Sequence, residues 1–145
     1  MATVAKGDTY ANDFLKLIFN ATAIANIADN AATSPLTNLY VSLHTSSVGG
    51  SGNQTTNEAT YTSYARVAVA RTSGGWTVTA DSVSPAATIS FPAATGGTNT
   101  ITNWAVGTAS SGTGKVLYRG AVSPSISVSS GVTPTLTTAT AITED

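Results

Sequence analysis

The N-terminal part of the chain carries a helical pattern of apolar residues. Seven of them recur at spacings of three and four, which places them on one stripe of a 3.6-residue helix: Tyr10, Phe14, Leu17, Ile18, Ala21, Ile24 and Ala25. We predict a helical segment over residues 8–30, with Asp8 as N-cap because its carboxylate can accept from the free amides of the first turn. Asn20 is a point at which the segment can divide into two shorter helices. The apolar stripe needs a sheet to bury against, so we expect the segment to pack on one.

The rest of the chain alternates between apolar and polar residues in short runs, which is the pattern of strands. Residues 38–45 alternate most regularly, with Leu39, Val41 and Leu43 on one face and the polar residues on the other. The further predicted strands are residues 64–71, 76–80, 88–91, 100–108, 115–122, 125–128 and 135–143. The glycine pair at 74–75 predicts a hairpin turn between 64–71 and 76–80. About eight short strands predict a mainly β fold, a β-sandwich or jelly-roll-like barrel with one N-terminal helical segment packed on the sheet.

The length of 145 residues predicts a single domain over residues 1–145. We divide it into an N-terminal arm (1–7), the helical segment (8–30) and a β domain (38–145). The glycine-rich stretch 46–59 has no periodicity, so we predict a long, exposed and mobile loop there. The predicted structural core consists of Phe14, Leu17, Ile18, Leu39, Val41, Leu43, Val67, Val69, Trp76, Phe91 and Trp104.

The composition excludes several classes of function. Charged residues make up 9% of the chain and the net charge is -1, so a basic footprint for nucleic acid is missing. The absence of cysteine removes disulfides and thiolate metal sites, and no apolar stretch is long enough to span a bilayer. Threonine and serine account for 43 of the 145 residues and aromatic residues for 7%, which favours strands around a thin core. A thin core is often completed by a partner, so we expect a homo-oligomer, with a trimer favoured.

The residues that could carry catalysis are few and scattered. His44 is the only histidine, and the predicted strands bring no orienting carboxylate to it, so we expect no Ser/His/Asp triad. Residues 109–116 imitate a phosphate-binding loop but have Ala109 at the first glycine position and Val116 at the hydroxyl position. The acids show no paired spacing, and one histidine without cysteine leaves no metal set. We therefore expect no catalytic residue, no cofactor and no metal.

Two further groups of side chains point to binding. The aromatic residues Trp76, Trp104, Tyr61 and Tyr64 could stack on sugars, although the tryptophans are needed for the core. Arginines on neighbouring strand positions pair either across strands or across a subunit boundary. The residues proposed for an interface are Met1, Ala2, Thr3, Val4, Arg66, Arg71, Glu144 and Asp145.

A series of short sequence runs carries a resemblance to a known family. The runs are YANDFL (10–15), LYVSLHT (39–45), YARVAV (64–69), FP (91–92), ITNWAVGTA (101–109), LYRG (117–120) and AITED (141–145). In this order they resemble a family of small structural proteins of tailed bacteriophages, often labelled tail fibre or minor structural protein. The resemblance covers nearly the whole chain, and it implies a virion component, assembled in the host cytoplasm, without catalytic function.

Three positions for such a protein stay open. A compact unit with a free arm favours a capsid decoration or cement protein, which self-associates and binds the major capsid protein or other virion proteins to stabilise the head. The alternative is a tail component, as a fibre, tip or tube protein. A second alternative is a host-glycan-binding module that uses Trp76, Trp104 and the long loop. None of the three requires nucleic acid or a membrane.

Overall fold

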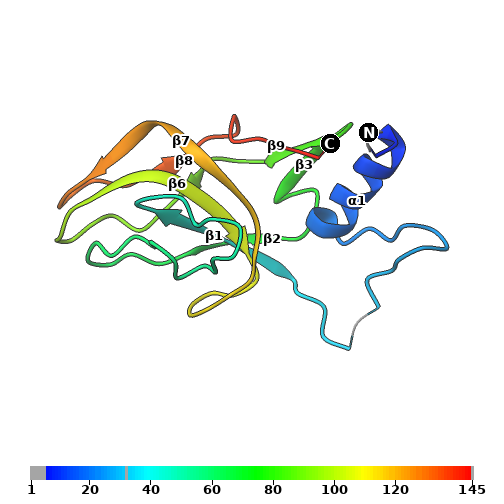
Figure 1. The fold of residues 1–145 in the computed structure, drawn as a ribbon, viewed down its shortest axis with the longest axis horizontal. Helices are drawn as coiled ribbons and strands as arrows, with labels where there is room; N and C mark the ends of the chain where they lie inside the picture. The colour runs from blue at the N-terminus through cyan, green and yellow to red at the C-terminus, as the bar shows by residue number, and fades with distance from the viewer. Residues whose placement is uncertain (1–5, 32, 145) are drawn as a thin grey trace. The chain divides into compact units, whose positions relative to one another are not determined.

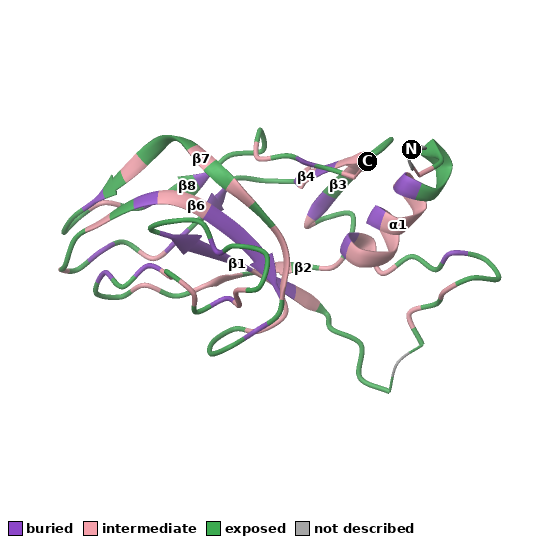
Figure 2. Cartoon of the chain, viewed as in Figure 1, coloured by how far each residue is buried: buried purple, intermediate pink, exposed green. Residues whose placement is uncertain are grey.

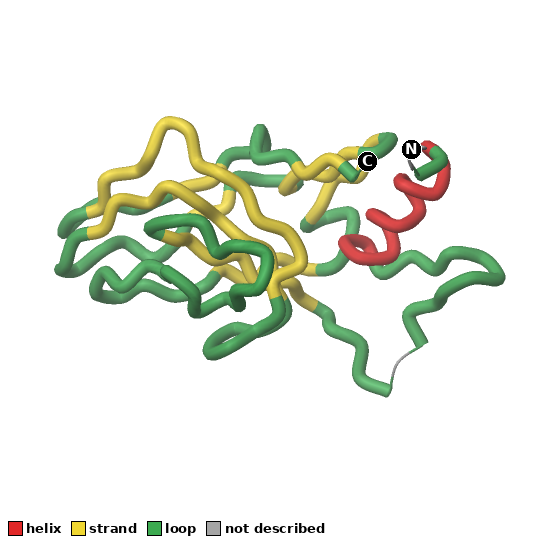
Figure 3. Tube along the Cα trace, in the orientation of Figure 1, coloured by secondary structure: helices red, strands yellow, loops and turns green. Residues whose placement is uncertain are grey.

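The computed structural model describes residues 6–31 and 33–144, so most of the predicted arm (1–7) lies outside the described residues. Within them, one helix is followed by nine strands (Figure 1). The elements are α1 (Asp8–Asn20), β1 (Asn38–His44), β2 (Val67–Ala70), β3 (Trp76–Thr79), β4 (Ser82–Pro85), β5 (Ile89–Ser90), β6 (Asn99–Gly107), β7 (Val116–Val128), β8 (Thr135–Leu136) and β9 (Ile142–Thr143). The mainly β class is confirmed. Figure 3 shows how much of the chain between these elements is loop.

Contacts divide the chain into two compact units. The first, here called the helical unit, comprises Met1–Thr37, Ala70–Thr88 and Thr137–Asp145, and the second, the sheet unit, comprises Asn38–Val69 and Ile89–Leu136. One limit, between Thr37 and Asn38, coincides with the predicted start of the β domain at residue 38. Two later segments of that predicted domain, Ala70–Thr88 and Thr137–Asp145, belong to the helical unit, so the chain enters each unit more than once. That the whole chain forms a single domain stays a prediction.

In the helical unit, α1 packs on the sheet of order β3-β4-β9. The helix ends at Asn20 because Ala21 adopts the left-handed conformation, with φ 53°. The predicted helical segment 8–30 is therefore too long, and residues 24–28 form a tight turn instead, in which the Ile24 and Ala28 backbones pair. Asp8 is the first helical residue rather than the N-cap, a position that Gly7 holds without a side-chain hydrogen bond. A carboxylate in the first turn still meets the positive end of the helix dipole.

The buried face of α1 is displaced by one residue from the predicted stripe. The fully buried positions follow an i, i+4, i+8 spacing: Ala11, Leu15 and Phe19. The predicted core residues Phe14, Leu17 and Ile18 are only half-buried. Phe19 decides the orientation, because its ring meets the buried indole of Trp76 edge to face, with centroids 4.8 Å apart.

The hairpin of the helical unit joins different strands from the predicted pair. β3 pairs with β4 in an antiparallel register that places Trp76 opposite Pro85 and Thr79 opposite Ser82. The turn lies at Ala80 and Asp81, where Ala80 takes a positive φ of 52°. β2 belongs to the other sheet, so the predicted hairpin between 64–71 and 76–80 is wrong, and strand β4 was not predicted.

The sheet unit contains a four-stranded antiparallel sheet of order β2-β1-β6-β7 and a separate β5–β8 pair, in a sandwich-like arrangement. β1 and β6 form its centre, with Leu43 opposite Trp104 and Val41 opposite Val106. Figure 2 shows that burial concentrates on these two strands. Of the predicted core, the buried members are Leu39, Val41, Leu43, Trp76, Phe91 and Trp104, whereas Val67 and Val69 are half-buried.

Two predicted strand boundaries differ in the C-terminal third. Residues 115–122 and 125–128 form one strand, β7, whose register against β6 shifts between Ile101 and Asn103. The predicted strand 135–143 is divided into β8 and β9, which belong to different units. A continuous apolar pattern therefore does not reveal where the chain leaves one sheet for another.

Candidate functional site: a buried polar cluster

A cluster of buried and half-buried polar side chains lies where the stretch 45–64 meets the end of β1, within the sheet unit. Its members are Ser42, His44, Gln54, Glu58, Tyr64 and Arg66, and we call them the polar cluster. A backbone hydrogen bond ties the stretch to β1, because Ala59 N–H donates to Leu43 O at 2.9 Å, and a second one within the stretch joins Thr45 N–H to Asn57 O at 2.9 Å. Val48 and Gln54 are buried. Residues 46–59 form a loop, as predicted, and many of them are exposed, but Val48, Gln54 and Ala59 are buried and anchor it; its mobility stays a prediction.

His44 joins the strand to this stretch through both ring nitrogens. Nδ1 lies 2.9 Å from Thr56 O, and Nε2 lies 2.8 Å from Ser42 Oγ. A carbonyl oxygen only accepts, so Nδ1 carries the proton and Nε2 accepts from the Ser42 hydroxyl. Burial lowers the pKa of His44 and outweighs the hydrogen bond to Thr56 and the nearby Glu58 carboxylate, which raise it. The imidazole is therefore neutral around pH 7.

The Ser42–His44 pair has the spacing of a nucleophile and its base but lacks two features of a catalytic triad. Both residues are 0% exposed, so no substrate reaches Ser42 Oγ. The group that orients His44 is the neutral carbonyl of Thr56, where a triad places a carboxylate to stabilise the imidazolium. The geometry suits a structural hydrogen-bond relay between β1 and residue 56.

Arg66 and Glu58 form a bidentate ion pair beside His44. Arg66 Nε lies 2.6 Å from Glu58 Oε1 and Nη2 lies 2.8 Å from Oε2. The hydroxyl of Tyr64 donates to Glu58 Oε1 at 3.0 Å and accepts from Leu43 N–H at 3.1 Å. Burial is the main cause that raises the pKa of Tyr64 above its ordinary value, so this hydroxyl keeps its proton. Through the Tyr64 hydroxyl, the ion pair therefore connects residues 58–66 to the backbone of β1.

The same arginine also organises the stretch 109–116. Arg66 Nη1 donates to Ala109 O at 2.9 Å, and Nη2 donates to Gly112 O at 2.7 Å. Its side chain is 2% exposed. Two carbonyls and a carboxylate of its own unit therefore occupy the guanidinium, and a role of Arg66 in an interface stays a prediction. These carbonyls also show why the stretch is no phosphate loop, since a phosphate needs N–H donors in their place.

Gln54 fills a slot between two glycines. Its Nε2 donates to Tyr40 O at 3.1 Å, and its Oε1 accepts from Ala109 N–H at 3.0 Å. A Cβ at Gly107 would lie 2.2 Å from Gln54 Cδ, and one at Gly114 would lie 2.1 Å from Gln54 Oε1. Only glycine leaves room for the amide at both positions.

Two further predicted interface residues, Arg71 and Glu144, are described, and both lie in the helical unit. Arg71 donates to the carbonyls of Leu17 and Ile18 at 2.8 Å each, and so satisfies the last turn of α1. Arg71 Nη1 also donates to Leu36 O at 2.7 Å, so this guanidinium too has partners within its own unit. Glu144 forms an ion pair with Lys6. Met1, Ala2, Thr3, Val4 and Asp145 lie outside the described residues.

The predicted aromatic platform does not form. Trp76 and Trp104 are 2% and 6% exposed, and Tyr61 is 2% exposed. Tyr61 and Tyr64 meet edge to face with centroids 5.3 Å apart, and Tyr64 stacks on Phe91. Because both tryptophans are buried, they offer no open face to a sugar.

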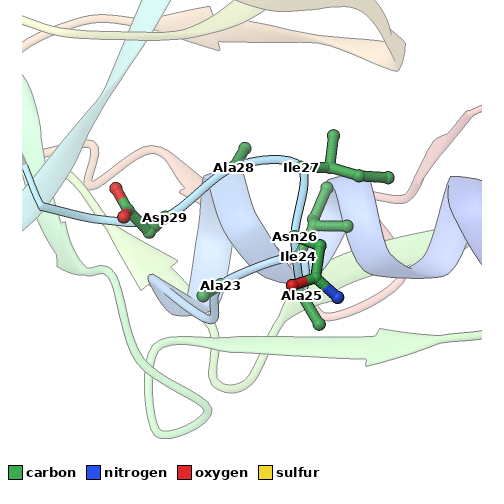
Figure 4. Close-up of a pocket in the computed structure, with 7 residues that line it drawn as sticks. All are labelled: Ala23, Ile24, Ala25, Asn26, Ile27, Ala28 and Asp29. Carbon is green, nitrogen blue, oxygen red and sulfur yellow. The ribbon is translucent and has the colours of Figure 1, made fainter.

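The surface pocket and the ionisable side chains of the described residues give little evidence of a further binding site. A shallow pocket of about 340 Å³ is lined by the single turn 23–29 (Figure 4), and the large side chain at its rim, Ile27, is 74% exposed. Among the residues that the structure describes, no three histidine, aspartate or glutamate side chains gather as a metal site requires. In the same part of the chain, no helix has the length and apolar character needed to cross a membrane.

Comparison with known proteins supplies the family. Residues 6–143 match the family model described as podophage GP4 fiber I protein gp80. The chain belongs to this gp80 family. No curated protein matches the chain. The gp80 match confirms the resemblance to phage structural proteins, and a fibre family favours the tail alternative over the head decoration that the sequence reading placed first.

Two members of the polar cluster in this gp80 chain, Gln54 and Glu58, were not among the predicted site residues, and Tyr64 was predicted only as a ring that could stack on sugars. Gln54 and Glu58 lie in a stretch without periodicity, so no pattern marked them as part of a cluster. The available signal was chemical. In a chain with only 9% charged residues, an isolated glutamine and glutamate in such a stretch indicate side chains that make internal hydrogen bonds.

Proposed function

We propose that this chain is a non-enzymatic structural component of a phage tail fibre. The observation that carries the proposal is the match to a podophage fiber protein family over residues 6–143, nearly the full length of the chain. A virion location follows from the same family in a coarse way. The tail position, the lack of enzymatic activity and the partners are the parts that we add.

The polar cluster supports a structural role. Its strongest hydrogen bonds link the sheet to the stretches 45–64 and 109–116, and the serine and histidine have no exposed surface. Buried ion pairs of this kind fix a conformation more than they add net stability. A fibre component needs loops held in one conformation, because each copy must present the same surface to its neighbours.

Self-association and attachment to other virion proteins complete the proposal. The surface carries few charges and the net charge is -1, so contacts must come from shape and main-chain hydrogen bonds more than from electrostatic steering. Repeated copies in a fibre let individually weak contacts act together.

Immunogold labelling of intact particles tests the tail position. Antibody raised against the purified chain is compared with an antibody against the major capsid protein as the matched control. We expect gold on the tail fibres and none on the head shell. Gold on the head, together with loss of heat resistance in particles that lack the protein, would refute the tail assignment and select the capsid decoration role.

A further inference from the structure

We infer that His44 is a pH-sensitive switch in the polar cluster: protonation of its imidazole releases residues 46–58 from β1 while the four-stranded sheet stays folded. The inference goes beyond the proposed function, because it concerns one loop of the sheet unit and does not depend on where the chain lies in the particle. In acid, the sheet unit would present a different surface to its neighbours.

The first observation is where His44 lies. It is the last residue of β1, its backbone pairs with that of Glu58, and it is 0% exposed. Its Nδ1 donates to Thr56 O at 2.9 Å, so the side chain joins the sheet directly to residues 46–58. A positive charge on this ring therefore arises at the junction between the strand and the loop, away from bulk solvent, where an uncompensated charge is costly.

The second observation is that protonation weakens the hydrogen bonds of the Ser42 hydroxyl. In the neutral ring, Nε2 accepts from this hydroxyl across 2.8 Å. Both ring nitrogens of an imidazolium donate, so Ser42 Oγ then accepts from Nε2 and its own proton turns to Ala105 O, 3.4 Å away. This distance is long for a hydroxyl donor, so the hydroxyl exchanges a short hydrogen bond for a weak one.

The third observation is that the carboxylate beside His44 is already paired. Both oxygens of Glu58 accept from Arg66, and Oε1 also accepts from the Tyr64 hydroxyl. Tyr64 is neutral, because burial raises its pKa. The cluster therefore balances one positive charge against one negative charge, and an imidazolium adds a second positive charge without a partner of its own.

The rest of the sheet unit supplies no other carboxylate. Glu58 is its only acidic residue, whereas Arg66, Lys115 and Arg119 are all basic. Asn103 of β6, which lies opposite His44, is uncharged. Arg119 of β7 reaches the loop itself, with its Nη1 3.5 Å from Ser47 Oγ. Protonation of His44 therefore adds charge to a unit that is already positive.

The fourth observation is that little apolar surface holds residues 46–58 closed. Val48 is the only apolar side chain among them, and Gln54 is the only other one that is buried. Strand β1, in contrast, pairs with β6 at every residue from Tyr40 to His44. Segments with few buried apolar contacts open at a lower free energy than the strands of a core, so the loop should open before the sheet does.

The sign of the pH effect follows from the burial of the ring. Burial lowers the pKa of His44 in the closed cluster, whereas an exposed ring in the open loop regains its ordinary value of 6.5. The open form therefore binds the proton first. The ratio of open to closed loop rises as the pH falls from about pH 7 to pH 5.

Thiol accessibility tests the switch, because the chain contains no native cysteine. Val48→Cys places a thiol at the buried apolar position of the loop, and Ser51→Cys is the matched control at an exposed position of the same loop. Both variants are labelled with dithiodipyridine at pH 7 and pH 5. The ratio of the two rates removes the pH dependence of the thiol reaction itself.

The same two variants are also prepared with His44→Gln, whose amide keeps a donor and an acceptor but binds no proton in this range. We expect the rate of Val48→Cys relative to Ser51→Cys to rise about tenfold from pH 7 to pH 5 when His44 is present. With His44→Gln the relative rate should stay constant. An equal rise in both backgrounds, or no rise with His44 present, would overturn the inference.

Proton NMR gives a second measure on the unaltered chain, since His44 is its only histidine. We expect the imidazole signals to move to those of an exposed imidazolium between about pH 7 and pH 5, while the indole N–H signal of Trp104 on β6 stays unchanged. Loss of the Trp104 signal over the same range would show unfolding of the sheet and would contradict a local release. Gold labelling tests the tail position separately, so either result leaves the proposed function standing.

Discussion

Replacing Arg66 by methionine probes the polar cluster at its centre. The substitution keeps an unbranched apolar stem of similar reach and removes the guanidinium. It leaves the Glu58 carboxylate without its bidentate partner and the carbonyls of Ala109 and Gly112 without their donors. The side chain of Arg66 is 2% exposed and that of Glu58 is 16% exposed, so water replaces these bonds poorly.

The expected cost is large for a single substitution. Removing one partner of a buried ion pair destabilises a protein by about 3–5 kcal/mol, because the other charge stays buried and unpaired. The partial exposure of Glu58 places the expected loss at the lower end, about 3 kcal/mol. The double variant Arg66→Met, Glu58→Gln should lose clearly less than the sum of the two single variants, since it leaves no unpaired charge.

The assay is urea denaturation followed by tryptophan fluorescence and circular dichroism. The chain has two tryptophans, Trp76 in the helical unit and Trp104 in the sheet unit, so a separate transition of either unit is visible. Lys115→Met is the matched control, because it removes a positive charge from an exposed position of the same unit and should change stability by less than about 0.5 kcal/mol. A loss below about 1 kcal/mol for Arg66→Met would refute the reasoning, because that is the value of an exposed ion pair.

Three further predictions concern other parts of the fold. The pKa of His44 in the folded chain lies below its ordinary value of 6.5, so on acidification the unfolded chain binds the proton first. The free energy of unfolding should therefore be highest above the ordinary pKa and fall between about pH 7 and pH 5. A flat profile over this range would contradict the buried imidazole. Phe19→Ala should cost about 3–5 kcal/mol in thermal or urea unfolding and Phe14→Ala clearly less, with equal losses contradicting the observed face of α1. Gly114→Ala should cost about 1–3 kcal/mol of the free energy of unfolding, because the added Cβ meets Gln54. Gly50→Ala is the control, since open space surrounds Gly50, and it should unfold like the wild type. Equal unfolding midpoints for the two variants would exclude the glycine slot.

The strands at the centre of the fold were predictable because their pattern is local. Leu39, Val41 and Leu43 alternate with polar residues, and the structure places them in β1 at the middle of its sheet. The predicted strand 100–108 likewise corresponds to β6. What the alternation did not show is that the polar face of β1 is buried too, with Ser42 and His44 both 0% exposed.

The helix face was not predictable from spacing, because two stripes compete in the same 13 residues. Phe14 and Leu17 form one, and Ala11, Leu15 and Phe19 form the other, about 100° away around the helix. The first has more bulky residues in sequence, but the packing of Phe19 on Trp76 from a distant segment selects the second.

The hairpin and the polar cluster depend on contacts that no local signal carries. The glycine pair at 74–75 imitates a hairpin turn, while the actual turn uses a left-handed alanine, Ala80, which sequence rules disfavour. In the cluster, Arg66 donates to the carbonyls of Ala109 and Gly112, which lie 43 and 46 positions further along the chain. Such contacts become visible only once the topology is known.

A side-chain-resolution density map of the assembled phage particle would test the central claim most directly. The account predicts that the fold of residues 6–31 and 33–144 fits density on the tail fibres, with the polar cluster closed and no bound substrate at Ser42. Density for the chain on the head shell and none on the tail would contradict it.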